Sequence, residues 1–229
     1  MIATVIALAA IQHTLRIEFV VGATHKYEQR LRYVSEDATE MLEFVTDLTY
    51  EVAEIDPTGM AKIRVGRLLT ETIVDGESFP QKDPKAVNWT EERRSPRGDV
   101  YDRTLTGSDG LLRARIERLS DIQFDAESIE IGGTWTFEWP DDDPNGLPGA
   151  VWSYRLESVI EGVAEIFVGY SELGVLPPIT ARGLVKVDAE TGWIISYELD
   201  AKHLIVPGDD ERMPMILRMT LIRKDADSS

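Results

Sequence analysis

The chain has 229 residues, of which 24 are Lys or Arg and 41 are Asp or Glu, so its formal net charge at pH 7 is −17. A chain this acidic is repelled by nucleic-acid phosphates and by anionic membrane surfaces, which excludes nucleic acid as an expected partner. The absence of cysteine excludes disulfides, thiolate metal sites and cysteine nucleophiles. The hydrophobic fraction of 43% is typical of a soluble globular protein with a sizeable core.

The first eleven residues, 1–11, are uncharged and mostly apolar. The run is too short for a transmembrane helix, which takes about 20 apolar residues, so we expect no transmembrane span. It has the length of the apolar region of a secretory signal, and Ala7-Leu8-Ala9 is a small-x-small pattern suited to cleavage. No basic residue precedes it, however. We expect a signal segment and a periplasmic or secreted protein; the alternative is a buried first segment in a cytoplasmic protein.

Residues 12–75 are expected to form a first β-rich half. Apolar and polar residues alternate along several stretches, and the longest runs from Leu42 to Val52. A period of two places one face of a strand in a core and the other in water, as in antiparallel sheets. The sequence Asp56-Pro57-Thr58-Gly59 predicts a hairpin turn, since Pro presets φ and Gly accepts a positive φ.

Residues 76–108 break this pattern with three prolines and many charges, and they predict a long exposed loop. The only predicted helix covers 109–121, with Ser108 as its N-cap and an apolar stripe at helical spacing. Residues 109–223 hold this helix and a second β half, and 224–229 form a polar tail. The expected fold is therefore mainly β, a curved antiparallel sheet or half-barrel with one helix, in one compact domain.

Two pairs of segments are similar in spacing and composition and indicate an internal repeat: Gly22–Tyr27 with Gly149–Tyr154, and Ile55–Met60 with Val187–Trp193. Together with other short motifs, they resemble a group of uncharacterised bacterial envelope proteins built from two related β-rich halves. The resemblance covers most of residues 14–222. Its motifs are Val21-Gly22 leading into Tyr27, Val52–Asp56, Ser95-Pro96-Arg97-Gly98, Ile131–Trp135 and Val187-Asp188 before Thr191-Gly192.

The group carries no catalytic residues that can be transferred to this chain. The expected architecture is also similar to that of lipoprotein-carrier half-barrels, in which a curved sheet holds acyl chains under a helical lid. This second similarity concerns shape alone, and a shared fold does not establish a shared function. It implies an apolar small molecule or lipid as a ligand.

Large aromatic residues recur at alternate positions of the second half. On the concave side of a curved sheet, such residues either line a pocket for an apolar ligand or form the core between the sheet and the helix. The core is the better supported alternative, since each buried aromatic contributes on the order of 2 kcal/mol. The candidate ligand-binding residues are Trp135, Trp139, Trp152, Tyr154 and Trp193.

The sequence Asp141-Asp142-Asp143-Pro144-Asn145-Gly146 matches the first half of a calcium loop. Asp141, Asp143 and Asn145 are the candidate ligands. The twelfth position, which should supply a bidentate Glu, is Trp152. A polar hairpin loop explains the same residues, since Asp, Pro, Asn and Gly all favour turns.

No motif indicates catalysis. The three histidines are far apart, and the sequence has no nucleophile elbow, phosphate-binding glycine loop or dinucleotide fingerprint. We therefore expect a non-enzymatic, exported protein that binds an apolar ligand, a lipid or acyl chain, or an envelope protein partner. The alternatives are a structural or interaction module with a fully packed core and a calcium-stabilised β protein.

Overall fold

The computed structural model of the chain describes residues 11–35, 41–81, 87–103, 110–125, 127–141, 147–205 and 214–224. Strands dominate both halves, and the helix lies between them. In the first half the strands are β1 (Gln12–His13), β2 (Thr24–Ser35), β3 (Met41–Ile55), β4 (Ala61–Val74), β5 (Glu77–Pro80), β6 (Asn88–Arg94) and β7 (Val100–Tyr101). The second half holds α1 (Gly110–Arg118), β8 (Ile129–Glu130), β9 (Thr134–Trp139), β10 (Ala150–Ile160), β11 (Val163–Glu172), β12 (Thr180–Asp188), β13 (Ile194–Ile205) and β14 (Pro214–Arg223).

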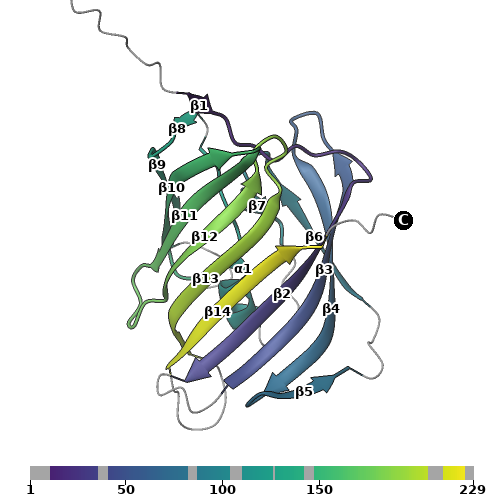
Figure 1. Cartoon of the computed structure of the whole chain (residues 1–229), viewed down its shortest axis with the longest axis vertical. Coiled ribbons are helices and arrows are strands. Elements are labelled where there is room, and N and C mark those ends of the chain that lie inside the picture. Colours follow the sequence, from purple (N-terminus) through teal and green to yellow (C-terminus); the bar gives the residue numbers. More distant parts are fainter. Residues whose placement is uncertain are drawn as a thin grey trace, which may run out of the picture.

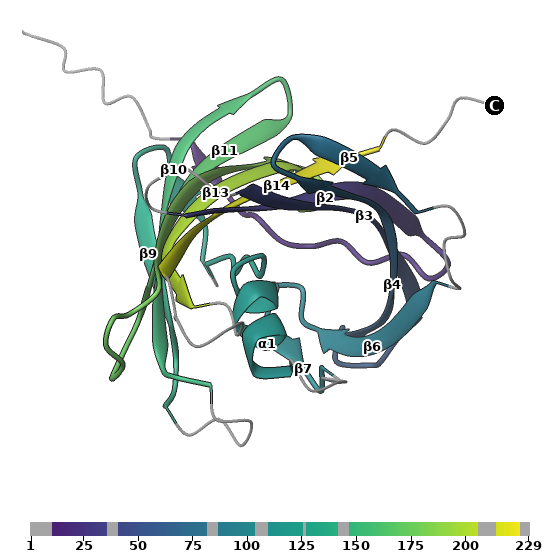
Figure 2. The same ribbon diagram turned by 90° about the horizontal axis from the view of Figure 1, so that it is seen from below.

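Twelve strands form one antiparallel sheet in the order β7-β6-β4-β3-β2-β14-β13-β12-β11-β10-β9, with β5 added beside β4. The sheet bends into a trough that runs the length of the molecule (Figure 1). Seen along the trough, the sheet curves around α1, which lies on its concave side (Figure 2). Among the described strands β7 and β9 are the two edges, so the sheet stays open. The expected mainly β, curved antiparallel fold with one short helix is confirmed.

The alternating pattern explains which face of each strand turns inward. In β10, Trp152, Tyr154 and Leu156 are buried, whereas Ser153 and Arg155 between them are exposed. A one-residue shift of register would turn these three large side chains to the solvent, so burial fixes the pairing of β10 with its neighbours.

Residues 76–108, expected to form a loop, contain β5, β6 and β7. The prediction missed β6 because the residues on its inward face are Thr90, Glu92 and Arg94, all buried. A strand whose core face is polar shows no hydrophobic period. The helix begins at Gly110 and ends at Arg118, close to the predicted range of 109–121. Its proposed N-cap, Ser108, lies outside the described residues.

Two chain segments close the concave side of the trough. We call residues 110–124 the inner segment; it consists of α1 and the six residues that follow. Its buried apolar side chains Ile116, Leu119, Ile122 and Phe124 belong to the main hydrophobic core. The second segment precedes β2 and contributes Leu15 and Ile17 to the same core. The core of this protein is therefore the contents of the trough.

The turn at Ser95-Pro96-Arg97-Gly98 connects these two segments. The Ile17 N–H donates to the Pro96 carbonyl, and the Phe124 N–H donates to the Arg97 carbonyl, both at 2.7 Å. Gly98 has a φ of 93°, and a Cβ there would lie 1.9 Å from the Ile122 carbonyl oxygen. Only glycine accommodates both this φ and this contact.

The two turns of the predicted repeat are built alike. In each, one carboxylate, Asp56 or Asp188, accepts hydrogen bonds from two backbone N–H groups of its own turn. The strand directions place both turns at the same rim of the trough. The matched strand starts, Gly22 and Gly149, lie at opposite rims. The duplication of the two halves stays a prediction.

Candidate functional site

Of the five predicted aromatic residues, three lie in a row on the concave side, and Trp193 and Trp139 lie apart from that row. Trp135, Tyr154 and Trp152 stack in a row, with ring centroids 5.1 and 5.8 Å apart. Trp193 is placed elsewhere, where it stacks on His25 of β2 at 3.8 Å. Trp139 is half-buried under the guanidinium of the helix residue Arg118, 5.2 Å from the ring centroid. The other four candidates are buried in the core.

We call Trp135, Trp152, Tyr154 and Tyr197 the aromatic wall. Polar atoms of three of these residues form hydrogen bonds with the inner segment. The Trp135 indole N–H donates to the Gln123 carbonyl at 2.9 Å, and the Tyr154 hydroxyl donates to the Gln123 side-chain oxygen at 2.7 Å. The Tyr197 hydroxyl of β13 donates to the Leu119 carbonyl at 2.7 Å. The aromatic wall therefore holds residues 119–123 in place through hydrogen bonds as well as packing.

The helix itself is attached to the same wall by two arginines. Arg115 forms a two-pronged ion pair with Glu172 of β11, at 2.8 and 2.5 Å. The Glu172 side chain is fully shielded from solvent and also accepts the Ile179 N–H at 3.0 Å. Arg118 donates to the Pro148 carbonyl at 2.6 Å. Burying a carboxylate this deeply is costly unless it is paired and hydrogen-bonded, as Glu172 is here.

At the opposite wall, four charged side chains form a cluster, which we call the charge cluster: the buried Glu92, Arg94 and Asp121, and the partly buried Arg103. Arg103 donates to Glu92 at 3.0 Å and, through two guanidinium nitrogens, to Asp121 at 3.0 and 2.7 Å. Arg94 donates to Glu92 at 3.1 and 2.7 Å and reaches Asp121 at 3.5 Å. The cluster thus links β6 to the inner segment.

The border of the charge cluster adds one more link between the sheet and the helix. Glu117 of α1 lies 3.0 Å from Arg67 of β4 and 3.7 Å from Arg103. The inner segment is therefore held by charged groups at both walls of the trough.

Protonation differs between the two carboxyl groups of the cluster. Burial alone raises the pKa of Glu92, but the charges and hydrogen bonds of Arg94 and Arg103 outweigh it and lower this pKa to about 2. For Asp121, burial raises the pKa and the same two arginines offset the effect only in part. On acidification, Asp121 of the inner segment accepts a proton before Glu92 of the sheet does.

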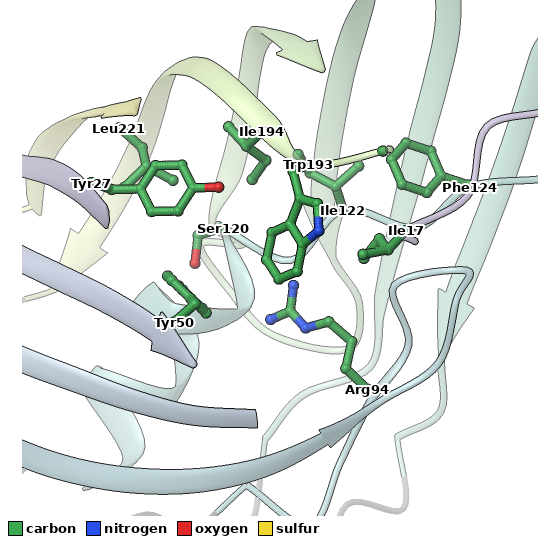
Figure 3. A pocket seen from close by; sticks show the side chains of 11 residues that line it. Ile17, Tyr27, Tyr50, Arg94, Ser120, Ile122, Phe124, Trp193, Ile194 and Leu221 are labelled. Carbon is green, nitrogen blue, oxygen red and sulfur yellow. The ribbon is translucent and has the colours of Figure 1, made fainter. Parts of the chain in front are cut away.

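A small cavity lies beside the charge cluster, at the rim that carries the Asp56 and Asp188 turns. Its volume is about 20 Å³, room for one water molecule. The cavity is lined mostly by apolar and aromatic side chains, and the Arg94 guanidinium points into it toward Trp193 (Figure 3). Ser120, Ile122 and Phe124 form the wall supplied by the inner segment.

The calcium prediction falls mainly on residues that the structure does not describe. Asp143 and Asn145 lie outside the described residues. Asp141 is described, and its carboxylate accepts the Gly149 N–H at 3.2 Å, a bond that closes the loop between β9 and β10. Within the described residues, no three His, Asp or Glu side chains are grouped to hold a metal ion. Calcium binding stays a prediction.

The pKa of His25 is shifted strongly. Its burial beneath Trp193, with a smaller contribution from the charge of Arg223, lowers its pKa from 6.5 to about 4. The folded protein therefore keeps His25 neutral between these two pH values, whereas the unfolded chain binds a proton there. Because the unfolded state takes up more protons, stability falls as the pH is lowered from 6.5 to about 4.

We expect His25→Phe to remove this part of the acid sensitivity. Phe keeps a ring stacked on Trp193 and cannot titrate. The wild type should lose roughly 1–2 kcal/mol more than the variant between pH 7 and pH 4, a value reduced because His25 is only partly buried. Urea unfolding of both proteins at the two pH values measures the difference. Equal losses in the two proteins would show that His25 is protonated in the folded state.

The sequence predicts the aromatic residues of the trough but not the charge cluster. The charged run that holds Glu92 and Arg94 predicts an exposed loop, because runs of charged residues are usually solvated. Their separation by two residues puts both on one face of a strand, which is the pattern that indicates their position. Nothing local in the sequence shows that Arg103 and Asp121 approach the same face.

In the described part of the chain, no helix is both long enough and apolar enough to cross a membrane. Comparison of the whole sequence with models of known protein families and with curated proteins found no match to either. The resemblance to bacterial envelope proteins therefore stays an expectation from short motifs.

Proposed function

We propose that this protein is a non-enzymatic binding protein that takes up an apolar chain, such as the acyl chain of a lipid, on the concave face of its sheet. In this proposal the inner segment moves aside, and the acyl chain of the ligand takes its place in the trough. The observation that carries the proposal is the attachment of the inner segment. Ion pairs and hydrogen bonds hold it at both walls, and its apolar side chains fill the trough between them.

The size of the cavity requires this movement. A volume of about 20 Å³ holds one water molecule and no acyl chain. An apolar ligand therefore reaches the aromatic wall only after residues 119–124 have left it. Water replaces the ordinary hydrogen bonds of this segment at a small net cost, about 0.5–1.5 kcal/mol each. The buried ion pairs cost more to open, unless the ligand or water compensates the charges that remain on the walls.

The free energy lost when the apolar side chains of the inner segment are exposed is close to that gained when an acyl chain is buried in their place. Ile116, Leu119, Ile122 and Phe124 each lose about 1.5–3 kcal/mol when exposed, or roughly 6–12 kcal/mol together. A chain of about 15 methylenes gains about 0.8 kcal/mol for each one buried, or roughly 12 kcal/mol. Terms of this similar size allow both uptake and release.

A packed trough also favours a second function, that of an interaction module. The small cavity is the observation that favours it, because a fully packed core provides no ligand site. The partner in that case is another envelope protein bound at the surface. The two proposals differ in whether the inner segment leaves the trough, which the following prediction tests.

We expect Glu172→Gln to raise the affinity for a fluorescent long-chain acyl probe about tenfold. The variant breaks the ion pair with Arg115 that anchors α1. Weakening the closed state by about 1.4 kcal/mol raises the population that can bind by that factor. Glu165→Gln is the matched control, since Glu165 lies on the same strand with its side chain on the outer face, paired with Lys186. Fluorescence titration measures all three proteins.

Equal affinity of the wild type and both variants would contradict the proposed movement of α1. Absence of probe binding in all three, with no lipid found by native mass spectrometry, would favour the interaction module.

The proposal places the protein outside the cytoplasm, in the periplasm or the medium, where acyl chains pass between membranes. It rests on the apolar pattern of residues 1–11, of which only Ile11 is among the described residues. Fractionation of cells that express the full chain tests this location. Recovery with the cytoplasmic proteins would support the cytoplasmic alternative.

A further inference from the structure

At the charge cluster, the inner segment places the carboxylate of Asp121 among apolar side chains. Asp121 is buried, and the residues around it, Leu119, Ile122 and Phe124, are buried and apolar. Arg103 grips the Asp121 carboxylate through both of its oxygens, at 2.7 and 3.0 Å. The geometry is the one that arginine forms with any free carboxylate.

The space next to this carboxylate is apolar. The cavity beside Arg94 is bounded by Tyr27 and Leu221 of the sheet, by Trp193, by Ile17 of the segment before β2 and by the inner segment (Figure 3). When the inner segment leaves, the cavity and the space that it vacates become one apolar channel. Arg94 and Arg103 stand at the side of this channel.

The charges that remain on the wall favour one class of ligand for the opened channel. Among the described residues of this wall, Arg67, Arg94 and Arg103 remain with one carboxylate, Glu92, whereas Glu117 and Asp121 leave with the inner segment. On the opposite wall Glu172 loses Arg115, so these groups still leave three guanidinium groups against two carboxylates. Buried guanidinium groups without a counter-charge are costly, so a neutral chain leaves part of this wall uncompensated. An incoming carboxylate restores the pairing that Asp121 provided.

We propose that the apolar ligand is a long-chain carboxylate, a fatty acid anion, and that Arg103 and Arg94 bind its head group where they now bind Asp121. This inference rests on the proposed function, because the channel opens only when the inner segment moves. It adds the chemical class of the ligand and the residues that select it. In this arrangement the inner segment competes with the ligand through a carboxylate of its own.

The test compares two amphiphiles that differ only in the head group. Dodecanoate and dodecan-1-ol are titrated at pH 8 against the full chain carrying a fluorescent acyl probe. The wild type should bind dodecanoate about tenfold or more tightly than the alcohol, the size expected for hydrogen bonds between charged groups. In Arg103→Gln the ratio of the two affinities should fall to near one.

Two further variants keep the test decisive. Arg93→Gln is the matched control, because Arg93 lies beside Arg94 on β6 but points outward to Asp56, and it should keep the wild-type ratio. Arg103→Lys retains the charge without the two-pronged geometry and should give an intermediate ratio. If Arg103→Gln does not fold, as judged by circular dichroism, Arg103→Lys and the wild-type ratio still decide.

The outcomes separate the head-group inference from the proposed function. Equal binding of acid and alcohol to the wild type would overturn the inference and leave the proposed function standing. Binding of neither would overturn both. A third arm adds vesicles of phosphatidylglycerol; displacement of the probe by these vesicles and not by dodecanoate would replace the carboxylate by a phosphate head group and overturn the inference.

Discussion

Replacing Arg94 by Met is expected to lower the free energy of unfolding by about 3–5 kcal/mol, because the change removes one partner from a buried charged pair. Glu92 accepts two hydrogen bonds from Arg94, and its side chain is 3% exposed. In the variant, Arg103 is the one described residue of the cluster that remains to compensate the charges of Glu92 and Asp121. Urea unfolding at pH 7 measures the loss.

The double variant Glu92→Met/Arg94→Met separates the cost of an unpaired charge from the value of the pair. Replacing both charges by apolar side chains of similar size should recover most of the stability lost in Arg94→Met. Arg93→Met is the surface control and should change stability by less than about 1 kcal/mol, since Arg93 pairs with Asp56 in solvent. A double variant as unstable as Arg94→Met would mean that the pair itself stabilises the fold.

Replacing Trp152 by Ala is expected to cost about 3–5 kcal/mol, as for other large aromatic residues removed from a core. Trp152 is fully buried and packs on Tyr154 and Tyr170, with ring centroids 5.8 and 4.7 Å away. Its removal leaves a hole under the inner segment that the stiff sheet does not fill. Thermal unfolding measures the loss, and added indole should restore part of it by occupying the hole.

Trp89→Ala is the matched control for Trp152→Ala. Trp89 is 41% exposed on β6, where Arg64 lies 4.7 Å from its ring centroid, so its loss should cost about 1 kcal/mol or less. A loss below 1 kcal/mol for Trp152→Ala, together with weaker binding of the acyl probe, would show that Trp152 lines a ligand site without supporting the fold.

The strands were predictable where one face is apolar. From Trp152 to Leu156 in β10, large apolar and polar side chains alternate, and the structure shows them as an inward and an outward face. The long run in β3 is also a strand, from Met41 to Ile55. The local sequence is enough in these cases because the alternation of apolar and polar residues within one strand indicates which of its side chains are buried.

The candidate site was less predictable because its contacts join distant parts of the chain. In the sequence, Arg103 precedes α1 and Asp121 follows it, and Glu172 follows Arg115 by 57 positions. No spacing rule connects such residues. The aromatic residues were found because size and alternation mark them, whereas the hydrogen bonds of Trp135 and Tyr154 to Gln123 depend on the path of the inner segment.

Uptake of a ligand requires that the trough opens locally, by movement of the inner segment, while the sheet stays folded. Proteins open locally at free energies that range up to that of global unfolding, with the core strands opening last. The cysteine-free chain offers a direct measure, since one introduced thiol is the only thiol present. Ala114→Cys puts it on α1 and Ala164→Cys puts it on β11, and both alanines are buried.

Thiol labelling rates of these two variants in native buffer, with and without dodecanoate, provide the most direct test. We expect the thiol at position 114 to react much faster than global unfolding allows, and faster still with dodecanoate, while the thiol at position 164 reacts only at the unfolding rate. Equal rates at both positions, unchanged by dodecanoate, would show that the inner segment is a fixed part of the core and would contradict the exchange.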